Sequence, residues 1–177
     1  MTAEQNDGMR TEYDWSNAAR GRYATRSTPG DGRRAWPAMV EELSTYTLRQ
    51  VRELEAALFA FFVLARHEST QQAARHVAAL LDAGMECRCG LGDPELLARL
   101  RGIAAEREWV EHPTAGSEQD REALQPVLQR LESIYDEVRA IRERVEQLLS
   151  EQLADAGLSS DEIERRTGET ARRWFAA

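Results

Sequence analysis

The side chains of this sequence that could do chemistry are two cysteines, three histidines and a short glycine-containing segment. Cys87 and Cys89 are one residue apart and follow His67 and His76 in the chain. A structural zinc site usually takes a more widely spaced cysteine pair together with a second pair of ligands. The pattern therefore favours an incidental cysteine pair over a metal or redox site, and we expect no metal and no cofactor.

The histidines and glycines match no catalytic motif. His67, His76 and His112 do not have the HxxxH or HExxH spacing that places two ligands on one helix face. General acid–base catalysis needs a partner group within hydrogen-bond reach of the histidine, and the spacing indicates none. Gly90-Leu91-Gly92 is too short for a dinucleotide-binding motif, and the chain has no lysine for a phosphate-binding loop. We expect a protein that is not an enzyme.

The charge of the chain is unevenly distributed. The 177 residues include 23 basic residues, all of them arginine, and 31 acidic ones, for a net charge of −8. Residues 10–34 hold six arginines against three acids, whereas the sequence from Trp36 onward holds 17 arginines and 26 acids. A nonspecific nucleic-acid or anionic-membrane binder needs positive potential. We therefore expect no nucleic-acid partner and no membrane partner.

Cysteine content and apolar runs bear on the compartment. Two cysteines are too few for a disulfide framework and suit a reducing environment. The first ten residues lack the apolar region of a secretory signal. The longest apolar run, 56–65, has ten residues, whereas a membrane span needs about 18 to 20. We expect a cytoplasmic protein.

The elements that would position these groups are helices. Residues 37 to about 67 repeat apolar side chains every three or four positions, and Pro37 suits the first turn of a helix. At 1.5 Å per residue this helix would be roughly 45 Å long. Its last third, ALFAFFVLA, is apolar on all sides and should be enclosed by other helices. The stripe consists of Val40, Leu43, Thr47, Val51, Leu54, Leu58, Phe61 and Ala65.

Two short helices and a second long one should follow. Ser69 and Asp93 are predicted N-caps, and Gly84 is a plausible end of the first short helix. Pro126 would kink the second long helix or mark its start, and Gly157 should end it. A final helix capped at Ser159 would reach Trp174 and Phe175. The second long stripe covers about four heptads and consists of Leu124, Val127, Leu131, Ile134, Val138, Ile141, Val145 and Leu148.

The sequence thus predicts an all-α fold with an irregular N-terminal arm. We expect an arm over 1–36, a helical bundle over 37–156 and a short C-terminal helix over 157–177. The simplest assembly pairs the two long helices antiparallel as a bundle or coiled coil, with the short helices completing it. The alternative is a homodimer through the 124–148 stripe, because this stripe and Phe59, Phe61 and Phe62 together offer more apolar surface than four helices can cover.

Residues 12–26 of the arm read EYDWSNAARGRYATR. This string resembles a short motif, roughly EYDFS…RGKYA.R, of small bacterial antitoxins from toxin–antitoxin modules. Trp15 stands where phenylalanine is usual and Arg22 where lysine is usual. The positions that match the motif are Asp14, Ser16, Arg20, Gly21 and Tyr23. The resemblance implies an arm that binds, and neutralises or regulates, a protein partner.

The arm also has the composition of a binding peptide. Tyr, Trp and Arg dominate interface hot spots, and a segment without a core of its own can fold on a partner. The alternative is that the arm packs back on its own acidic body. The predicted partner-binding residues are Tyr13, Asp14, Trp15, Arg20, Gly21, Tyr23 and Arg26. We therefore expect a non-enzymatic interaction protein, antitoxin-like or accessory to a defence module.

The C-terminal segment carries a second resemblance. Its sequence GLSSDEIERRTGETARRWF is similar to a helix-turn-helix of bacterial regulators with the pattern GLS..EI.RRTG…RRW. It is about three residues shorter between Ile163 and Trp174, nearly one helical turn, and its four arginines are balanced by four acids. The resemblance implies a transcriptional regulator as the alternative function.

Overall fold

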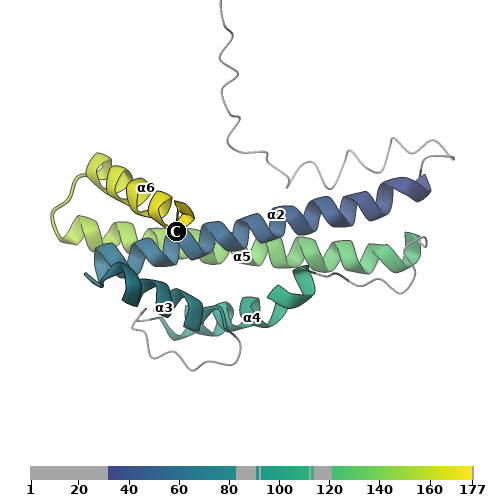
Figure 1. Ribbon diagram of the computed structural model, residues 1–177, viewed down its shortest axis with the longest axis horizontal. Helices are drawn as coiled ribbons and strands as arrows, with labels where there is room; N and C mark the ends of the chain where they lie inside the picture. The colour runs from purple at the N-terminus through teal and green to yellow at the C-terminus, as the bar shows by residue number, and fades with distance from the viewer. Residues whose placement is uncertain (1–31, 83–90, 92, 112, 114–120, 177) are drawn as a thin grey trace, which may run out of the picture.

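The computed structural model describes residues 32–82, 91, 93–111, 113 and 121–176, and their regular structure is entirely helical (Figure 1). The elements are α2 (Gly32–Ala60), a short π-helix η1 (Phe61–Ala65), α3 (Thr70–Leu80), α4 (Pro94–Glu111), α5 (Arg121–Asp155) and α6 (Ser160–Ala176). The predicted all-α fold is confirmed for these ranges.

The apolar stripe of α2 forms the centre of the core. Leu54, Leu58 and Phe61 are fully buried. Thr47, the one polar member of the stripe, is also fully buried, and its hydroxyl donates to the Leu43 carbonyl at 2.8 Å within the same helix. This bond satisfies the hydroxyl, so that a polar side chain is accommodated on the apolar face.

The apolar run predicted to be enclosed is buried from Ala57 to Phe62, whereas Val63, Leu64 and Ala65 at its end are only partly buried. Ala56 and Ala60 are almost completely buried on the side of α2 away from the stripe. Helix α6 lies alongside this part of α2 (Figure 1), and the ring of its Trp174 is 5.1 Å from that of Phe59. The apolar residues continue around the helix because α5 and α6 cover different faces of it.

Both prolines of the long helices lie inside the helix rather than at its start. Helix α2 begins at Gly32, five residues before Pro37, and α5 begins at Arg121, five residues before Pro126. The predicted start at residue 37 was therefore too late. A proline this near the N-terminus removes one main-chain hydrogen bond at most, and the arginine and alanine at 33–35 favour helix.

Ion pairs across α4 establish its direction relative to α5. Arg99, early in α4, pairs with Glu137 at 2.6 Å. Glu106, later in α4, pairs with Arg130, which lies earlier in α5, at 2.5 Å. The two helices are therefore antiparallel.

Helix α4 is also antiparallel to α2. Near the end of α4, the Val110 carbonyl accepts a hydrogen bond from the Ser44 hydroxyl at 2.5 Å. Earlier in α4, Arg107 reaches Glu55, which lies farther along α2, at 2.9 Å. Because α4 is antiparallel to both long helices, α2 and α5 run parallel to each other.

The antiparallel pairing of the long helices predicted from the sequence was wrong. Helices α3 and α4 lie one after the other on one side of the α2–α5 pair, and α6 lies on the opposite side (Figure 1). At 1.5 Å per residue, α3 and α4 are about 16 and 27 Å long, so together they match the length of α2. The two short helices thus act as a single return segment, and α5 starts again from the end of the pair where α2 starts.

The stripe of α5 is buried within one chain. Leu131, Val138, Ile141 and Val145 are fully buried against the rest of the fold, so none of their surface is left exposed for a second copy. The buried face then continues through Leu149 and Leu153, whereas the predicted Leu148 is only partly buried. A straight helix with 3.6 residues per turn drifts from a heptad pattern, which accounts for this shift.

The predicted N-caps of the two short helices are confirmed. The Ser69 hydroxyl accepts a hydrogen bond from the Gln72 main-chain N–H at 3.3 Å. The Asp93 carboxylate accepts from the N–H groups of Glu95 and Leu96 at 3.1 and 3.0 Å. Gly84, the predicted end of the first short helix, lies outside the described residues, and α3 ends at Leu80.

Gly157 ends α5, as predicted. Its φ of +89° lies in the left-handed region. Its N–H bonds the Ala154 carbonyl at 2.8 Å, and the Leu158 N–H bonds the Leu153 carbonyl at 3.1 Å. These two bonds form a Schellman motif. Ser159 then caps α6, since its hydroxyl accepts from the Glu162 N–H at 3.4 Å.

Candidate functional site

The residues predicted to bind a partner lie outside the part of the chain that the structure describes. They are Tyr13, Asp14, Trp15, Arg20, Gly21, Tyr23 and Arg26. Cys87, Cys89 and His112 also lie outside it. The candidate site in the described part of the chain therefore consists of residues that the sequence did not predict to be functional.

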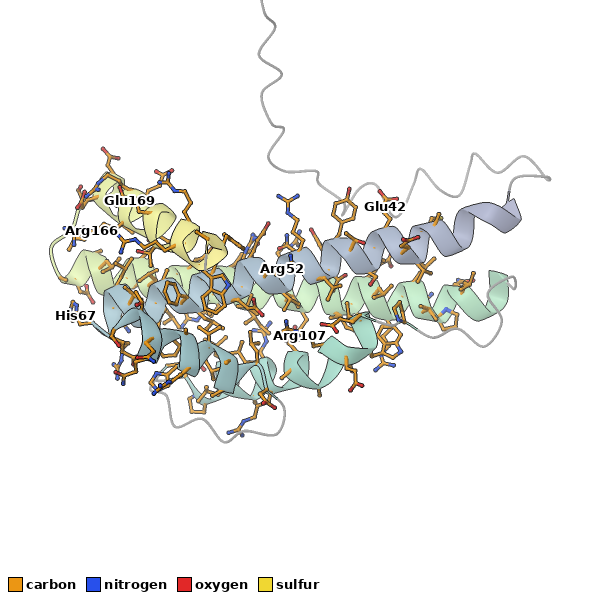
Figure 2. All side chains as sticks on the ribbon, in the orientation of Figure 1. Glu42, Arg52, His67, Arg107, Arg166 and Glu169 are labelled. Atoms are coloured by element: carbon orange, nitrogen blue, oxygen red, sulfur yellow. The ribbon has the colours of Figure 1, made fainter. Side chains whose placement is uncertain are left out.

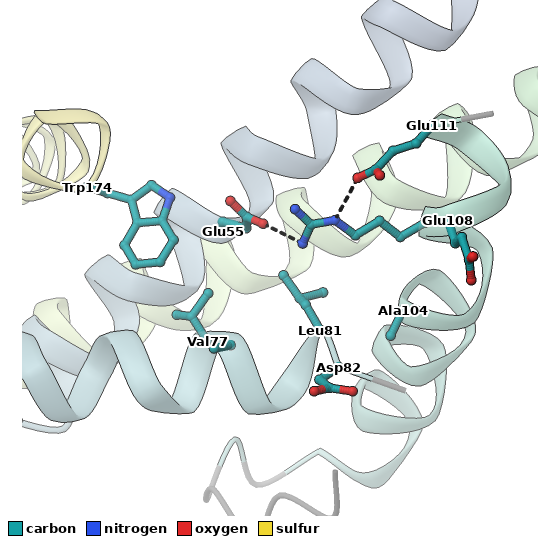
Figure 3. A pocket seen from close by; sticks show the side chains of 10 residues that line it. Glu55, Val77, Leu81, Asp82, Ala104, Glu108, Glu111 and Trp174 are labelled. Carbon is teal, nitrogen blue, oxygen red and sulfur yellow. Dashed lines mark hydrogen bonds and ion pairs between the residues drawn. The ribbon is translucent and has the colours of Figure 1, made fainter. Parts of the chain in front are cut away.

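A groove of about 540 Å³ is lined by residues of α2, α3, α4 and the end of α6 (Figure 3). Its apolar lining comes from Val77, Ala78 and Leu81 of α3 and from Ala104 of α4, with the Trp174 indole at one wall. The volume lies within the range of about 300 to 1,000 Å³ that is common for ligand pockets. The groove can therefore accept several side chains of a peptide.

The guanidinium of Arg107 organises the polar side of the groove (Figures 2 and 3). Its Nη1 donates to Glu55 at 2.9 Å, and its Nε lies 3.5 Å from Glu111. The Glu55 side chain is 13% exposed, whereas that of Glu111 is 45% exposed. Arg107 therefore mainly neutralises the buried carboxylate of Glu55, whose charge would otherwise be costly to bury.

Three more carboxylates stand at the rim. Asp82, Glu108 and Glu111 are exposed and line the groove together with Glu55. Four acids against one arginine leave a formal charge of −3 on the residues that line it. The groove combines an apolar floor with a negative rim, and this arrangement suits a cationic segment that carries apolar or aromatic side chains.

Helix α6 positions Trp174 at the groove. The Schellman turn at Gly157 sends the chain back along α2, and the Phe59 contact holds the indole over α2. The sequence predicted that the helix reaches Trp174. It did not predict that the indole would line one groove with side chains of α3 and α4, because these segments lie far apart in the sequence.

One sequence signal could have pointed to Glu55. It lies four residues after the buried Val51 and four before the buried Phe59, on an almost apolar part of α2. A carboxylate at such a position predicts a cationic partner. Its identity as Arg107 depends on the path of α4.

A second polar cluster lies where the chain turns from η1 into α3. The Nδ1 of His76 is 2.9 Å from the Glu68 carboxylate, and its ring is 5.2 Å from that of Phe62. A histidine oriented by a carboxylate resembles part of a nucleophilic triad. Among the described residues, no hydroxyl or thiol is hydrogen-bonded to its other ring nitrogen. The pair therefore ties the start of α3 to the turn before it.

His67 at the same turn has a backbone role (Figure 2). Its φ is +56°, the one positive value at a non-glycine residue in the described ranges. It follows the end of η1, at the position where a left-handed residue commonly reverses the chain. Its exposed ring is thus placed by the turn.

A third polar cluster joins α2 to α5. Arg142 of α5 donates to Glu53 of α2, and its Nε lies 3.6 Å from Glu146. Burial raises the pKa of Glu146, and the nearby Arg142 opposes this effect. Gln50 donates to Glu53 at 3.0 Å. The cluster connects the parallel long helices on their polar side.

Helix α6 is continuous where a helix-turn-helix would need its turn. Thr167 and Gly168 lie inside one helix of 17 residues. Arg165 and Arg166 both bond Glu162, at 2.7 and 2.6 Å, and these bonds lower the pKa of the Glu162 carboxyl to about 2. These arginines are therefore engaged within their own helix.

The described ranges contain no group of three or more histidine, cysteine or acidic side chains that could hold a metal ion. In the same ranges, no helix combines the length and the apolar character needed to cross a membrane. Comparison of the chain with protein-family models, with curated proteins and with solved structures gives no match.

Proposed function

We propose that this protein is a non-enzymatic cytoplasmic interaction protein whose N-terminal arm binds a protein partner. The partner would be neutralised or regulated, as by an antitoxin or an accessory of a bacterial defence module. The arm supplies Trp15, Arg20 and Tyr23 as anchors, with Tyr13, Asp14, Gly21 and Arg26 beside them.

One observation carries this proposal. The apolar stripes of the helical body are buried within the chain, and Phe175, at 58% exposure, is the one exposed large hydrophobic side chain among the described residues. Strong protein interfaces depend on a few large anchors that become buried. Since the described body offers so few of them, the aromatic and arginine side chains of the arm are the better candidates.

The body then serves as a scaffold. Over the region where both stripes keep a near-heptad spacing, we interpret the α2–α5 pair as a short parallel coiled coil. The polar cluster around Arg142 and Glu53 links the same two helices. A rigid pair of this kind would present the arm from one end of the molecule, because α2 begins directly after it.

The test is quantitative capture of the partner by tagged full-length protein. A Trp15→Ala, Arg20→Ala double variant should lose the partner, because truncating a hot spot typically costs about 2 kcal/mol, or about 30-fold in affinity. Its melting temperature should equal that of the parent. Co-expression of the captured partner with parent and variant then shows whether the arm also suppresses the partner's activity.

A matched control is Arg173→Ala, Phe175→Ala. It also removes one exposed arginine and one exposed aromatic side chain, but from α6. The control should keep the partner. The proposal is wrong if the arm variant still captures the partner, or if the α6 variant loses it instead.

A further inference from the structure

The groove between α2, α3, α4 and Trp174 carries charge that its lining residues do not balance. Arg107 is already engaged by Glu55 and approached by Glu111. Glu108 is exposed and has no ion-pair or hydrogen-bond partner among the described residues. Glu108 can therefore accept a further cation without disrupting a pair among the described residues.

We propose that residues 20–26 of this chain dock in this groove when no partner is bound. This inference goes beyond the proposed function because it concerns the free protein. The segment reads RGRYATR, with three arginines and no acidic residue, so its formal charge of +3 is opposite in sign to that of the exposed rim carboxylates Glu108 and Glu111. Arginine forms bidentate pairs with carboxylates, and Tyr23 supplies an aromatic ring for the apolar floor.

The length of the chain allows this placement at the near end of the groove. The end of α4 lies level with Ser44, whose hydroxyl bonds Val110. Ser44 is 12 residues beyond Gly32, or about 18 Å along α2. Arg26 is six residues before Gly32 and can reach about 20 Å in an extended chain.

The far end of the groove is within reach as well. Glu55 lies 23 residues beyond Gly32, or about 35 Å along the helix. Arg20 is 12 residues before Gly32 and can reach about 40 Å. The arm would thus run antiparallel to α2, with Arg26 toward Glu111 and Arg20 toward Glu55.

Docking of this kind is weak and depends on the covalent connection. Ion pairs at exposed carboxylates are individually worth little and are screened by salt. A short connection raises the effective concentration of the arm at the groove to about the millimolar range. The docked arm cannot engage a partner at the same time. The apparent affinity for the partner is therefore the intrinsic affinity multiplied by the fraction of molecules in which the arm is free.

The test is limited trypsin cleavage of full-length protein at low salt, with the products cut after Arg20, Arg22 and Arg26 quantified by mass spectrometry. The groove variant is Glu108→Gln, Glu111→Gln. Its arm should be cut about three to ten times faster than that of the parent, the ratio expected when two partly exposed ion pairs are lost. Cleavage reports the fraction of free arm when docking and release are fast.

The matched control is Glu132→Gln, Asp136→Asn on α5. It also removes two exposed carboxylates. Glu132 has no ion pair among the described residues, and Asp136 has a weak pair inside its helix, with Arg139 at 3.9 Å. Its arm should be cut at the parental rate. At about 1 M salt, where the Debye length is about 3 Å, the arms of parent and groove variant should be cut at the same rate.

Equal cleavage of parent and groove variant at low salt would overturn the inference, as would equal acceleration in the control. Protection that increases with protein concentration would overturn it as well, because the groove would then hold the arm of a second chain. The measurement needs no partner, so its failure is distinguishable from failure of the proposed function.

Discussion

The packing of α2 beside α5 can be tested at the contact between Glu53 and Arg142. The two side chains belong to different long helices, are 28% and 23% exposed, and are hydrogen-bonded. A double-mutant cycle with Glu53→Gln and Arg142→Met removes the charges while keeping most of the aliphatic stems. Coupling between these two residues would show that the two long helices lie side by side at these positions.

The magnitude follows from the surroundings of Arg142. Its Nε is buried without a hydrogen-bond partner, and the nearest other carboxylate, Glu146, lies 3.6 Å away. The Glu53→Gln change therefore leaves a mostly buried guanidinium with a weaker acceptor, which should cost about 1.5 to 3 kcal/mol. We expect a coupling energy of about 1 to 2 kcal/mol, between the values of exposed pairs and of buried ones.

The assay is urea unfolding followed by circular dichroism at the helical band. With a slope of about 2 kcal/mol per molar urea, a loss of 2 kcal/mol lowers the midpoint by about 1 M. A control cycle with Arg139→Met and Glu143→Gln removes an exposed pair within α5, where the two groups are 3.8 Å apart. Its coupling should be about 0.3 to 0.5 kcal/mol whatever the direction of α2.

A coupling energy below about 0.3 kcal/mol for Glu53 and Arg142 would refute the reasoning, since sites without contact are additive within that margin. It would mean that the two side chains are not neighbours. The polar link between α2 and α5 at these positions would then be wrong.

Three further predictions concern single positions. Gly157→Ala should destabilise the protein by about 1 to 2 kcal/mol, because its φ of +89° strains a residue with a Cβ although no neighbouring atom crowds that Cβ. Gly168→Ala, in open space inside α6, should instead stabilise the protein by about 0.5 to 1 kcal/mol. Urea midpoints that move in the same direction would contradict one of these two predictions. Ile141→Asp should lower the melting temperature by at least about 10 °C, because an unpaired charge would replace a fully buried side chain, and an unchanged melting temperature would remove this residue from the core. The pairing of Glu162 with Arg165 lowers the pKa of the Glu162 carboxyl from 4.5 to about 2, so this pair stabilises α6 at pH values above 4.5 and the contribution disappears as the pH falls from 4.5 to 2. The stability of Glu162→Gln should therefore depend less steeply on pH in that window. Identical acid-unfolding profiles of parent and variant would contradict the assignment.

Features encoded within a few neighbouring residues could be predicted from the sequence. The caps at Ser69 and Asp93 and the helix end at Gly157 were read correctly, as was the buried part of the first stripe from Val51 to Phe61, although Ala65 at its predicted end is only partly buried. Each of these features depends on side chains within about one helical turn. The helix starts were less well predicted. Pro37 and Pro126 mark the second turn, since neighbouring helix formers extend the helix at little cost.

The tertiary structure decided the direction of α5 and the identity of the groove. Helix direction depends on whether α3 and α4 together return the chain along α2, which no local pattern encodes. The groove depends on contacts such as that of Glu55 with Arg107, 52 residues apart. Periodicity shows which face of a helix is buried, because burial needs only an apolar stripe. It cannot show which helix covers that face, because any apolar stripe of similar length could cover it. The lengths of the connecting segments, the ion pairs and the packing select one arrangement.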